Sequence, residues 1–385
     1  MAPPAGRLVA HQAVSSTRKL LIISNGHGED AIAAQIVHRL PSGFAVEAYP
    51  TLGDGRAYAG ICPIVGPRAQ LPSEGWRNVK HSVARDISGG GIATIWPGLR
   101  FIRAARDAYD RVLVVGDMIG VYGCWVTGHR AITYLDVYKT GFGRGYLGVD
   151  KLILRRTART VFCRAAPLAE SLKAAGIDAR AAGNVMMDTI PRTGLSLPRS
   201  RPLGLTLLPG SRAHATINFA LQAAALAKLP ADTLPDLFLA VAASVDIDQL
   251  AAAANLSRAP DASGLGRLRG GSLEILLVPG AALGDALDAS NLVLSQAGTA
   301  TVQAIGLGRP SITFQTAGDR PSRFRDESRL FGDGRYVVAA DPEAIAAALS
   351  NLLTDPTDRT RRSTIGRERI GPPGAIDAII AELNQ

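Results

Sequence analysis

One unit recurs along this 385-residue chain: a short apolar run, a glycine-bearing turn, and a segment with the apolar spacing of a helix. Its first copy begins with the run 19–24, after which apolar residues at 32, 36, 37 and 40 would share one helix face. Similar runs, each followed by a helical segment, lie at 111–116, 160–163, 203–208, 237–241, 274–278, 292–294 and 311–314. Strands that are apolar throughout and separated by helices form parallel sheets covered on both faces. The predicted fold class is therefore α/β, with doubly wound, Rossmann-like parallel sheets.

An interruption of this pattern divides the chain nearly in half. Residues 191–202 are rich in proline, arginine, serine and glycine and show no apolar periodicity, which is typical of a linker. We further expect a disordered extension over 1–17, domains over 18–190 and 203–370, and a C-terminal helix within 371–385 that could cross back to the first domain. Two such domains facing a cleft would bind ligands where their strands end.

The excess of positive over negative charge lies in the first half of the chain. The net charge is +9, and residues 1–190 hold 23 of the 42 Lys and Arg but only 14 of the 33 Asp and Glu, which leaves 19 of each sign for the second half. The first half is therefore expected to meet an anionic partner, unless its basic surface is merely solvated. Nucleic acid is not expected, because no recognised binding module is present and aromatic residues make up only 5% of the chain.

The cysteines, the histidines and the apolar runs argue against disulfides, metal sites and membrane-spanning segments. The three cysteines are far apart and form no Cys-x-x-Cys pair, which argues against a disulfide scaffold and a zinc cluster and favours a reducing compartment. The six histidines lack metal-ligand spacing, so no metal is expected. No apolar run is long enough to span a membrane, and residues 1–17 lack the apolar core of a secretory signal. We expect a cytoplasmic protein that could bind the inner face of the membrane.

The first glycine-bearing turn, residues 24–30, reads Ser-Asn-Gly-His-Gly-Glu-Asp. Two glycines around His27 allow a tight turn and the close approach of a ligand, and the helix that follows favours an anion at its N-terminus. His27 is a candidate base, because an imidazole with a pKa of about 6.5 can accept a hydroxyl proton. The predicted substrate-binding residues of this loop are Ser24, Asn25, Gly26, Gly28, Glu29 and Asp30. In the alternative interpretation, Glu29 and Asp30 only complement the helix dipole.

Asp117 stands at the end of a second buried run, directly after Gly116. A carboxylate in this position projects into a cleft, which favours a raised pKa and a role as the base or as the group that orients it. A helix N-cap is the equally compatible alternative.

Two loops of the second half are suited to phosphate. In Leu-Pro-Gly-Ser-Arg (208–212) a glycine, a hydroxyl and a guanidinium meet at a helix start, and in Ser-Gln-Ala-Gly-Thr-Ala-Thr (295–301) small residues open another helix. We expect the corners at Gly210 and Gly298 to converge on one gap between the halves and to hold a pyrophosphate.

These motifs resemble the lipid-A-disaccharide synthases. The resemblance rests on residues 207–212, on 297–301 with Gly308-Arg309-Pro310, and on Gly-Asn-Val-Met-Met-Asp at 183–188, which is similar to a Gly-His-Pro-Leu-x-Asp segment of that family. The loop 24–30 takes the place of their Ser-Gly-Glu-x-Ser-Gly-Asp loop and looks most like the branch called lipid-A-disaccharide-synthase-related proteins. Four motifs in the right order span about residues 19–355.

The resemblance implies a metal-independent glycosyltransferase of the GT-B type, with an acceptor-binding domain first and a UDP-sugar-binding domain second. It implies a hexosamine-type UDP-sugar as donor, no further cofactor, and a lipid-linked or glycolipid acceptor. Carried over, His27 or Asp117 would be catalytic and Asn184 would join the substrate-binding residues. The implied nucleotide-sugar-binding residues are Gly210, Ser211, Arg212, Ser295, Gln296, Gly298, Thr299, Ala300 and Gln303.

The chain departs from the family pattern at three positions. Gln303 replaces a glutamate expected to hold the ribose hydroxyls, and an amide lacks that charge. Ala215 replaces a second glutamate, and His27 has no counterpart in the family loop. These changes bear on the substrates more than on the scaffold, and they keep two alternatives open: a UDP-sugar 2-epimerase-like enzyme, and a non-catalytic relative that binds sugar nucleotide or lipid.

A segment of the basic half suits a membrane surface. Apolar residues at 92, 95, 96, 99, 101 and 102 alternate with Arg100, Arg103 and Arg106. At a bilayer surface the apolar side could be buried while the arginines meet anionic headgroups. The alternative is an ordinary amphipathic helix packed on its own sheet.

Overall fold

The computed structural model describes residues 17–68, 95–143, 145–210, 214–316 and 321–385. Residues 1–16 of the predicted extension, Ile92 of the predicted surface segment, and Ser211 and Arg212 of the predicted phosphate loop lie outside these ranges. The chain divides into two compact units, residues 1–133 and 134–385. Within the described residues, none of the helices combines the length and apolar character that crossing a membrane requires.

The first sheet has six strands in the order β2-β1-β3-β4-β5-β6. They are β1 (Arg18–Ser24), β2 (Phe44–Pro50), β3 (Arg111–Gly116), β4 (Ile132–Asp136), β5 (Ala158–Phe162) and β6 (Ala179–Arg180). β1 pairs in parallel with both β2 and β3, and β5 pairs in parallel with β6. Leu20, Leu21, Ile22 and Ile23 have no exposed surface, so the unbroken apolar run of β1 reflects helices or loops on both of its faces.

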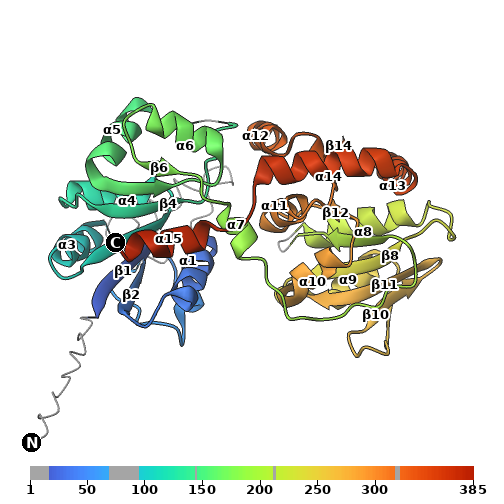
Figure 1. Cartoon of the computed structure of the whole chain (residues 1–385). Helices are drawn as coiled ribbons and strands as arrows, with labels where there is room; N and C mark the ends of the chain where they lie inside the picture. Colours follow the sequence, from blue (N-terminus) through green and yellow to red (C-terminus); the bar gives the residue numbers. More distant parts are fainter. Residues whose placement is uncertain (1–16, 69–94, 144, 211–213, 317–320) are drawn as a thin grey trace, which may run out of the picture. The chain divides into compact units, whose positions relative to one another are not determined.

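Helices connect the strands of this sheet (Figure 1). In the first unit they are α1 (His27–Arg39), the 3-10 turn η1 (Arg56–Tyr58), α3 (Ile95–Ala105) and α4 (Met118–Val126). In the second unit they are α5 (Gly148–Thr157), α6 (Ala166–Lys173) and the short α7 (Val185–Asp188). α1 and α4 follow β1 and β3 directly, as the strand, turn and helix pattern of the sequence predicts.

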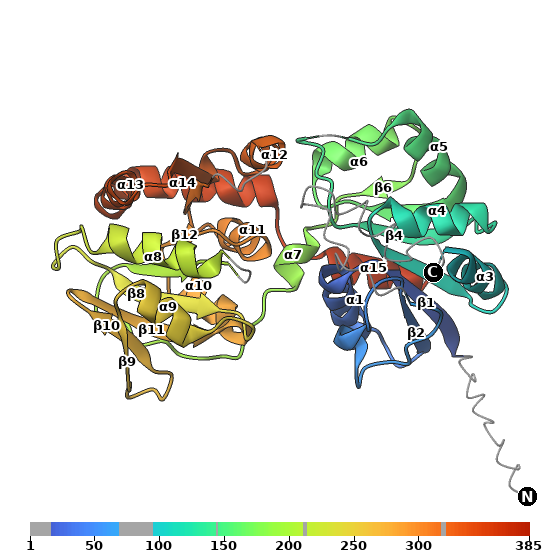
Figure 2. The ribbon, with the colours of Figure 1, turned by 180° about the vertical axis from the view of Figure 1, so that it is seen from behind.

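The second sheet has eight strands in the order β14-β13-β12-β7-β8-β11-β10-β9 (Figure 2). They are β7 (Gly204–Leu208), β8 (Asp236–Val241), β9 (Ser257–Ala259), β10 (Arg267–Gly270), β11 (Leu273–Pro279), β12 (Leu292–Ser295), β13 (Ser311–Gln315) and β14 (Arg335–Ala339). β10 pairs antiparallel with both β9 and β11, whereas the pairs from β11 through β8, β7, β12 and β13 to β14 are parallel. The predicted α/β class with parallel sheets is confirmed, and the antiparallel edge is an addition that the sequence pattern did not predict.

Helices pack on both faces of the second sheet. Leu237 and Leu239 of β8 belong to a core with α8 (Ala215–Leu226), α9 (Ile247–Ala253) and α13 (Pro342–Thr354). Phe238 and Ala240 of the same strand belong to a separate core with α10 (Leu283–Asp288) and α11 (Thr299–Gly306). Because successive side chains of a strand point to opposite faces, this alternation is the signature of a doubly wound sheet. The remaining helices are α12 (Pro321–Phe331), α14 (Pro356–Ile370) and α15 (Ala375–Leu383), and the 3-10 turns are η2 (Gly280–Ala282) and η3 (Gly332–Gly334).

The C-terminal helix is fastened to β5 and β6. The buried carboxylate of Glu382 in α15 accepts hydrogen bonds from the Thr160 hydroxyl at 3.0 Å and from the Arg180 guanidinium at 2.9 Å, and it forms an ion pair with Arg159 at 3.2 Å. A buried charge is tolerated in this position because it is paired and hydrogen-bonded. The last helix of the chain is thus part of the structure around the first sheet, although more than 200 residues separate Glu382 from its partners.

The predicted linker contains no helix or strand, yet side-chain contacts hold it. The Arg192 guanidinium donates to both carboxylate oxygens of Asp288 at 3.0 and 3.1 Å, and the Thr193 amide and hydroxyl donate to Asp285 at 2.8 and 3.0 Å. Leu195 and Leu197 pack on the core beneath α10. The segment 191–202 therefore lies against the second sheet domain.

Candidate functional site

The loop that follows β1 covers a buried hydrogen-bond chain. Ser24 Oγ, at the end of the strand, donates to Asp30 Oδ1 at 2.5 Å and lies 2.7 Å from the hydroxyl oxygen of Tyr58. All three side chains are almost fully buried. Within the described residues, the second carboxylate oxygen of Asp30 is buried and has no hydrogen-bond partner.

This environment changes the pKa values of Asp30 and Tyr58, the two ionisable residues of the buried hydrogen-bond chain. Burial raises the pKa of Asp30 to about 6, against the opposing effect of the hydrogen bond from Ser24. The negative charge of the neighbouring Glu29 raises the pKa of Asp30 further. Burial also raises the pKa of Tyr58, so this phenol remains protonated and can donate. A carboxyl group that exchanges a proton near neutral pH thus lies directly beneath the loop.

Asn25 connects the ends of three strands. Its Oδ1 accepts a hydrogen bond from the Thr51 hydroxyl, which follows β2, at 2.7 Å. Its Nδ2 donates to Asp117 Oδ1 at 3.1 Å. Because both ends of the amide are engaged, the orientation of Asn25 is fixed.

Asp117 is the N-cap of α4. The Ile119 amide donates to Asp117 Oδ1 at 2.9 Å, the geometry of a capping aspartate. The same oxygen accepts from Asn25. The sequence allows two interpretations of Asp117, a base and a helix N-cap. The structure shows the N-cap, and the Oδ1 atom that makes it also orients Asn25.

Glu29 is buried against the glycine corners that end β1 and β3. Gly26 and Gly116 have φ angles of 140° and 134°, which side-chain-bearing residues rarely adopt. A methyl group at Gly26 would lie 2.9 Å from Glu29 Oε2, and one at Gly116 would lie 3.1 Å from Glu29 Cγ. Both corners require glycine because the backbone angle and the nearby carboxylate leave no alternative.

His27 and Gly28 form the exposed part of the loop. α1 begins at His27, and no side chain caps its start. Gly53, in the loop after β2, lies beside the imidazole, since a methyl group there would be 3.2 Å from His27 Cε1. The imidazole and the first turn of α1 are therefore at the surface, whereas the acidic residues of the loop, Glu29 and Asp30, are buried below.

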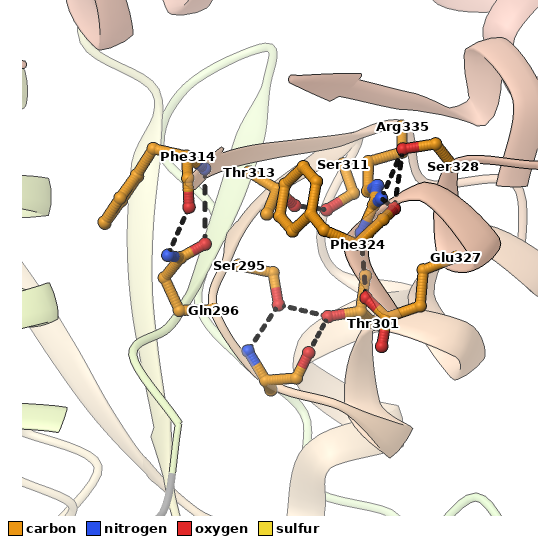
Figure 3. A network of polar contacts seen from close by, with 11 residues as sticks. Ser295, Gln296, Thr301, Ser311, Thr313, Phe314, Phe324, Glu327, Ser328 and Arg335 are labelled. Atoms are coloured by element: carbon orange, nitrogen blue, oxygen red, sulfur yellow. Dashed lines mark hydrogen bonds and ion pairs between the residues drawn. The ribbon is translucent and has the colours of Figure 1, made fainter. Parts of the chain in front are cut away.

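In the second sheet domain, the loop after β12 is held by its own side chains (Figure 3). Ser295 Oγ lies 2.6 Å from Thr301 Oγ1 and accepts from the Ala297 amide at 3.2 Å, and the Thr301 hydroxyl also bonds the Ala297 carbonyl oxygen at 2.5 Å. Gln296 makes two hydrogen bonds to the backbone of Phe314 on β13, one from its Nε2 at 2.6 Å and one to its Oε1 at 3.2 Å. The loop is consequently preorganised by its own hydrogen bonds.

Gly298 and Thr299 are the exposed residues of this loop, at the start of α11. Gly298 is the N-cap residue and provides no side-chain cap, and Ala300 is half-buried. The first amides of α11 therefore face outward over a fixed loop, an arrangement that suits an anion at the helix N-terminus.

The corner after β7 lies beside this loop. The Gln296 amide donates to the Leu208 carbonyl oxygen at 2.8 Å, and a methyl group at Gly210 would lie 3.4 Å from the Gln296 carbonyl oxygen. Gly210 has a φ of 99°. The corners at Gly210 and at 295–298, which the sequence predicts to cooperate, are thus adjacent at the ends of the paired strands β7 and β12.

Two predicted ligand residues are instead buried within the protein. Asn184 caps α7 by accepting from the Met186 amide at 3.0 Å, and its Nδ2 donates to the Ile370 carbonyl oxygen at 3.0 Å. The Gln303 Nε2 donates to the Met186 carbonyl oxygen at 3.0 Å. Since both side chains are almost fully buried and bonded to backbone, they do not offer their amides to a substrate here.

Tyr58 and Thr51 are contributors that the sequence analysis did not identify. Tyr58 lies 34 residues beyond Ser24 in sequence and Thr51 lies 26 residues beyond Asn25. Thr51 directly follows β2, a strand that the apolar-run search also missed. Recognition of β2 would have been the signal, because the end of a strand adjacent to β1 must lie near the β1 loop.

Among the described residues, no group of three or more His, Cys, Asp or Glu side chains is arranged to hold a metal ion. The hydroxyls, amides and helix amides of the two loops are suited instead to hydroxyl and phosphate groups.

No model of a known protein family matches the chain, and no curated protein matches its sequence. Solved structures do match. A putative UDP-N-acetylglucosamine 2-epimerase from Listeria monocytogenes is 15% identical with a TM-score of 0.61, and the match covers 96% of each chain. The Neisseria meningitidis UDP-GlcNAc 2-epimerase bound to UDP-GlcNAc is 11% identical with a TM-score of 0.57, covering 95% of this chain and 99% of that one. The glycosyltransferase SnogD from Streptomyces nogalater is 16% identical with a TM-score of 0.52, covering 95% and 99%.

These similarities establish the fold: two Rossmann-like α/β domains of the GT-B type, as in sugar-nucleotide epimerases and glycosyltransferases. The alignments extend over nearly the whole chain, so both sheets are included. Nothing in them is specific to the lipid-A-disaccharide synthases.

The raised pKa of Asp30 predicts a pH-dependent stability. A carboxyl group whose pKa rises from 3.8 to about 6 on folding favours the folded state while protonated, so its contribution is lost as pH rises through that window. The Asp30→Asn variant should therefore gain about 2–3 kcal/mol relative to wild type between about pH 3.5 and pH 7.5. Urea unfolding at both pH values measures this change. The variant Asp232→Asn, at an exposed position, is the control, and a pH-independent difference between Asp30→Asn and wild type would contradict the assignment.

Proposed function

We propose that this chain is a GT-B-type glycosyltransferase that moves a hexosamine-type sugar from a UDP-sugar to a lipid-linked or glycolipid acceptor. The observation that carries the proposal is the adjacency of the Gly210 corner and the preorganised loop 295–301 at the ends of β7 and β12. The resemblance of the motifs to the lipid-A-disaccharide synthases supplies the acceptor class.

On the donor side, the outward amides at Gly298, Thr299 and Ala300 would hold the diphosphate. Such a group needs hydrogen-bond donors fixed in advance, and the Ser295–Thr301 and Gln296–Phe314 contacts fix them. Gly210 would allow the diphosphate to approach the backbone of the neighbouring corner. Ser211 and Arg212 follow Gly210 in sequence and would complete the site, with Arg212 opposing the charge on the leaving UDP. Gln303 is not assigned a nucleotide contact, because Met186 occupies its amide.

On the acceptor side, His27 would be the base. It is exposed at the start of α1, and an imidazole nitrogen can accept a proton from an acceptor hydroxyl. Asp117 would be a positioning residue, since its Oδ1 already accepts from Ile119 and Asn25. The oxygen of the acceptor would attack the anomeric carbon of the sugar while UDP departs with the electrons of the broken bond.

A UDP-sugar 2-epimerase is the second candidate, because two of the three similar structures described above are UDP-GlcNAc 2-epimerases. The fold and the two loops are compatible with both reactions, and the fate of the C2 hydrogen distinguishes them. Inversion at C2 requires that its bond to hydrogen breaks and forms again, whereas transfer leaves that bond intact.

A membrane-bound acceptor would require the protein to reach the bilayer. Ile95 and Trp96 of α3 are 53% and 72% exposed, and Val126 of α4, a helix that packs against α3, is 62% exposed. Arg100 and Arg103 of α3 are also exposed. An apolar surface with aromatic and cationic residues is typical of proteins that bind anionic membranes at the interface.

The first prediction from this proposal concerns the reaction. In D₂O, with UDP-GlcNAc and glycolipid acceptors, we expect acceptor-dependent release of UDP and no deuterium at C2 of the recovered donor, as followed by NMR and mass spectrometry. His27→Ala should lower turnover by about 10²–10⁴-fold. His38→Ala, exposed in the last turn of the same helix, should leave turnover unchanged. Deuterium at C2 would favour the epimerase, and full turnover by His27→Ala would remove His27 as the base.

A second prediction concerns the donor loop. Thr301→Val keeps the shape of the side chain but removes the hydroxyl that bonds Ser295 and Ala297. We expect UDP to bind about 5–10-fold more weakly, as for the loss of one or two buried hydrogen bonds. Calorimetric titration with UDP measures this effect. Thr313→Val, in the neighbouring strand β13, is the matched control and should bind UDP like wild type. Equal affinities of Thr301→Val and wild type would show that the loop does not hold UDP.

A third prediction concerns the membrane. The protein should float with anionic phosphatidylglycerol vesicles at low salt, and salt should weaken the binding because it screens the arginines. The double variant Trp96→Ser/Val126→Ser should lose most of this binding, since each exposed apolar side chain contributes about 1 kcal/mol or more when it leaves water. Ile217→Ser, at a residue 61% exposed in α8, is the control. Absence of wild-type flotation would remove the membrane-binding surface.

A further inference from the structure

A separate polar cluster lies where β4 and β5 end, and the proposed reaction does not use it. Its members are Asp136 at the end of β4, Lys139 and Tyr146 in the segment before α5, and Arg164 just before α6. Figure 1 shows α5 and α6 side by side at this end of the sheet. The carboxyl ends of parallel strands are the usual place for ligands in α/β sheets.

Asp136 is fully buried, and its hydrogen bonds are supplied locally. Its Oδ1 accepts from the amides of Tyr138 and Lys139 at 2.7 and 2.9 Å. Its Oδ2 accepts from the Tyr146 hydroxyl, which lies 3.1 Å from that of Tyr134. This carboxylate therefore holds the loop after β4 in place and does not form an ion pair with Arg164 within the described part of the chain.

Arg164 is more than nine-tenths buried but only partly hydrogen-bonded. Its Nη1 donates to the Val137 carbonyl oxygen at 2.8 Å. Its Nε and Nη2 are buried and, within the described residues, have no hydrogen-bond partner. Burial lowers the pKa of this guanidinium, with the charge of Asp136 opposing the effect. Buried donors without partners are costly, and a buried cation with two of them is uncommon unless something completes the site.

The geometry of the two unused donors indicates what would complete it. The N–H bonds of Nε and Nη2 lie along one edge of the planar guanidinium and point the same way. This edge matches two oxygens of a carboxylate or of a phosphate group. Nη1, the donor on the other side, is already bound to Val137. Water could accept from these donors but brings no charge, whereas an oxyanion satisfies both donors and also neutralises the buried guanidinium.

The neighbouring side chains suit an anion in charge, and the loop beside them is closely packed. The ammonium of Lys139 is the second cation; it donates to the Gly145 carbonyl oxygen at 3.2 Å and lies 4.9 Å from the centre of the Tyr146 ring. Arg164 and Lys139 together exceed the charge of Asp136 by one unit. Gly141 brings the loop against the start of α6, where a methyl group would lie 2.5 Å from the Leu168 amide nitrogen. Among these three side chains, one positive charge is therefore left without a counter-charge.

We propose that the Nε–Nη2 edge of Arg164, with Lys139 as the second cation, is an oxyanion-binding subsite. It takes two oxygens of a singly charged group, supplied either by a carboxylate or by a phosphodiester. The subsite rests on the proposed function only in that the anion would belong to the acceptor, because the cluster lies in the sheet domain assigned to acceptor binding. Binding of the anion requires the loop after β4 to shift, and Lys139 would exchange its contact with Gly145 for one with the ligand.

The Nε–H resonance of Arg164 in a ¹⁵N-edited NMR spectrum of the full chain provides a direct test. Arg164→Lys, which keeps the charge but loses the two-donor edge, assigns the signal by its disappearance. Titration of wild type with acetate in one arm and dimethyl phosphate in another should move this signal saturably in at least one arm, and the arm that responds identifies the source of the oxyanion. An unmoved signal in both arms overturns the proposal.

Two further variants separate the subsite from general anion binding. Lys139→Gln should weaken the responding anion about tenfold, since it removes one charge from the site. Arg156→Lys, on the exposed side of α5, should titrate like wild type. If Arg164→Lys does not fold, through-bond correlation of the Nε–H signal with the Arg164 backbone amide in ¹³C,¹⁵N-labelled wild type assigns the signal instead. The wild-type titration then still decides the matter, and unchanged affinity in Lys139→Gln contradicts the role of the second cation. UDP should leave the Arg164 signal unmoved, so a failure of UDP binding does not bear on this subsite.

Discussion

The central strands of both sheets are buried on their two faces, and this burial concentrates the chemistry of the chain at the strand ends. Within β1 the residues 20–23 have no contact with solvent, and the alternating residues of β8 belong to two separate cores. A polar side chain in these strands needs a buried partner, as Thr206 of β7 has in the Ala286 carbonyl oxygen and the Ser290 hydroxyl, and few such partners are available there. The loops that follow the strands are therefore where hydroxyls, carboxylates and free amides can gather.

Glycines at the corners that follow these strands allow neighbouring loops to come close together. Gly26, Gly116 and Gly210 all have positive φ angles, and each stands where a buried strand turns into a loop. At the first two, the space that a side chain would occupy is taken by Glu29, and at the third it is bounded by the Gln296 carbonyl. The corners thus bring neighbouring loops into contact, which explains why short sequence motifs far apart in the chain form local networks.

The sequence predicted the elements whose signal is contained in one run of residues. Continuous apolar runs such as those of β1, β3 and β8 identify buried strands without any knowledge of their partners. The short strands β9 and β10 could not be found in this way, because their residues include Arg258, Arg267 and Arg269 and their pairing depends on the edge provided by β11. β4 was also missed, because Thr133 and Asp136 interrupt its sequence Ile-Thr-Tyr-Leu-Asp and leave no continuous apolar run.

The candidate site shows the same limit at the level of side chains. The motifs correctly indicated that loops 24–30 and 295–301 lie at strand ends. The type of a residue, however, does not tell which way its side chain points. Asn184 and Gln303 have the chemistry of ligand residues, yet the carbonyl oxygens of Ile370 and Met186 occupy their amide donors. Tyr58 could not be predicted at all, because its contact with Ser24 depends on the path of the chain after β2.

Three buried carboxylates illustrate how a functional position differs from a structural one. Glu382 is held by Thr160, Arg159 and Arg180, and Asp136 accepts three hydrogen bonds. Asp30 accepts a hydrogen bond from Ser24, and its second oxygen is buried with no partner among the residues that the structure describes. Selection for stability alone would supply that partner or replace the acid, as it has at the other two positions. Under the proposed function, a ligand hydroxyl or a mobile proton would supply to the under-satisfied acid beneath the exposed His27 what the folded chain does not.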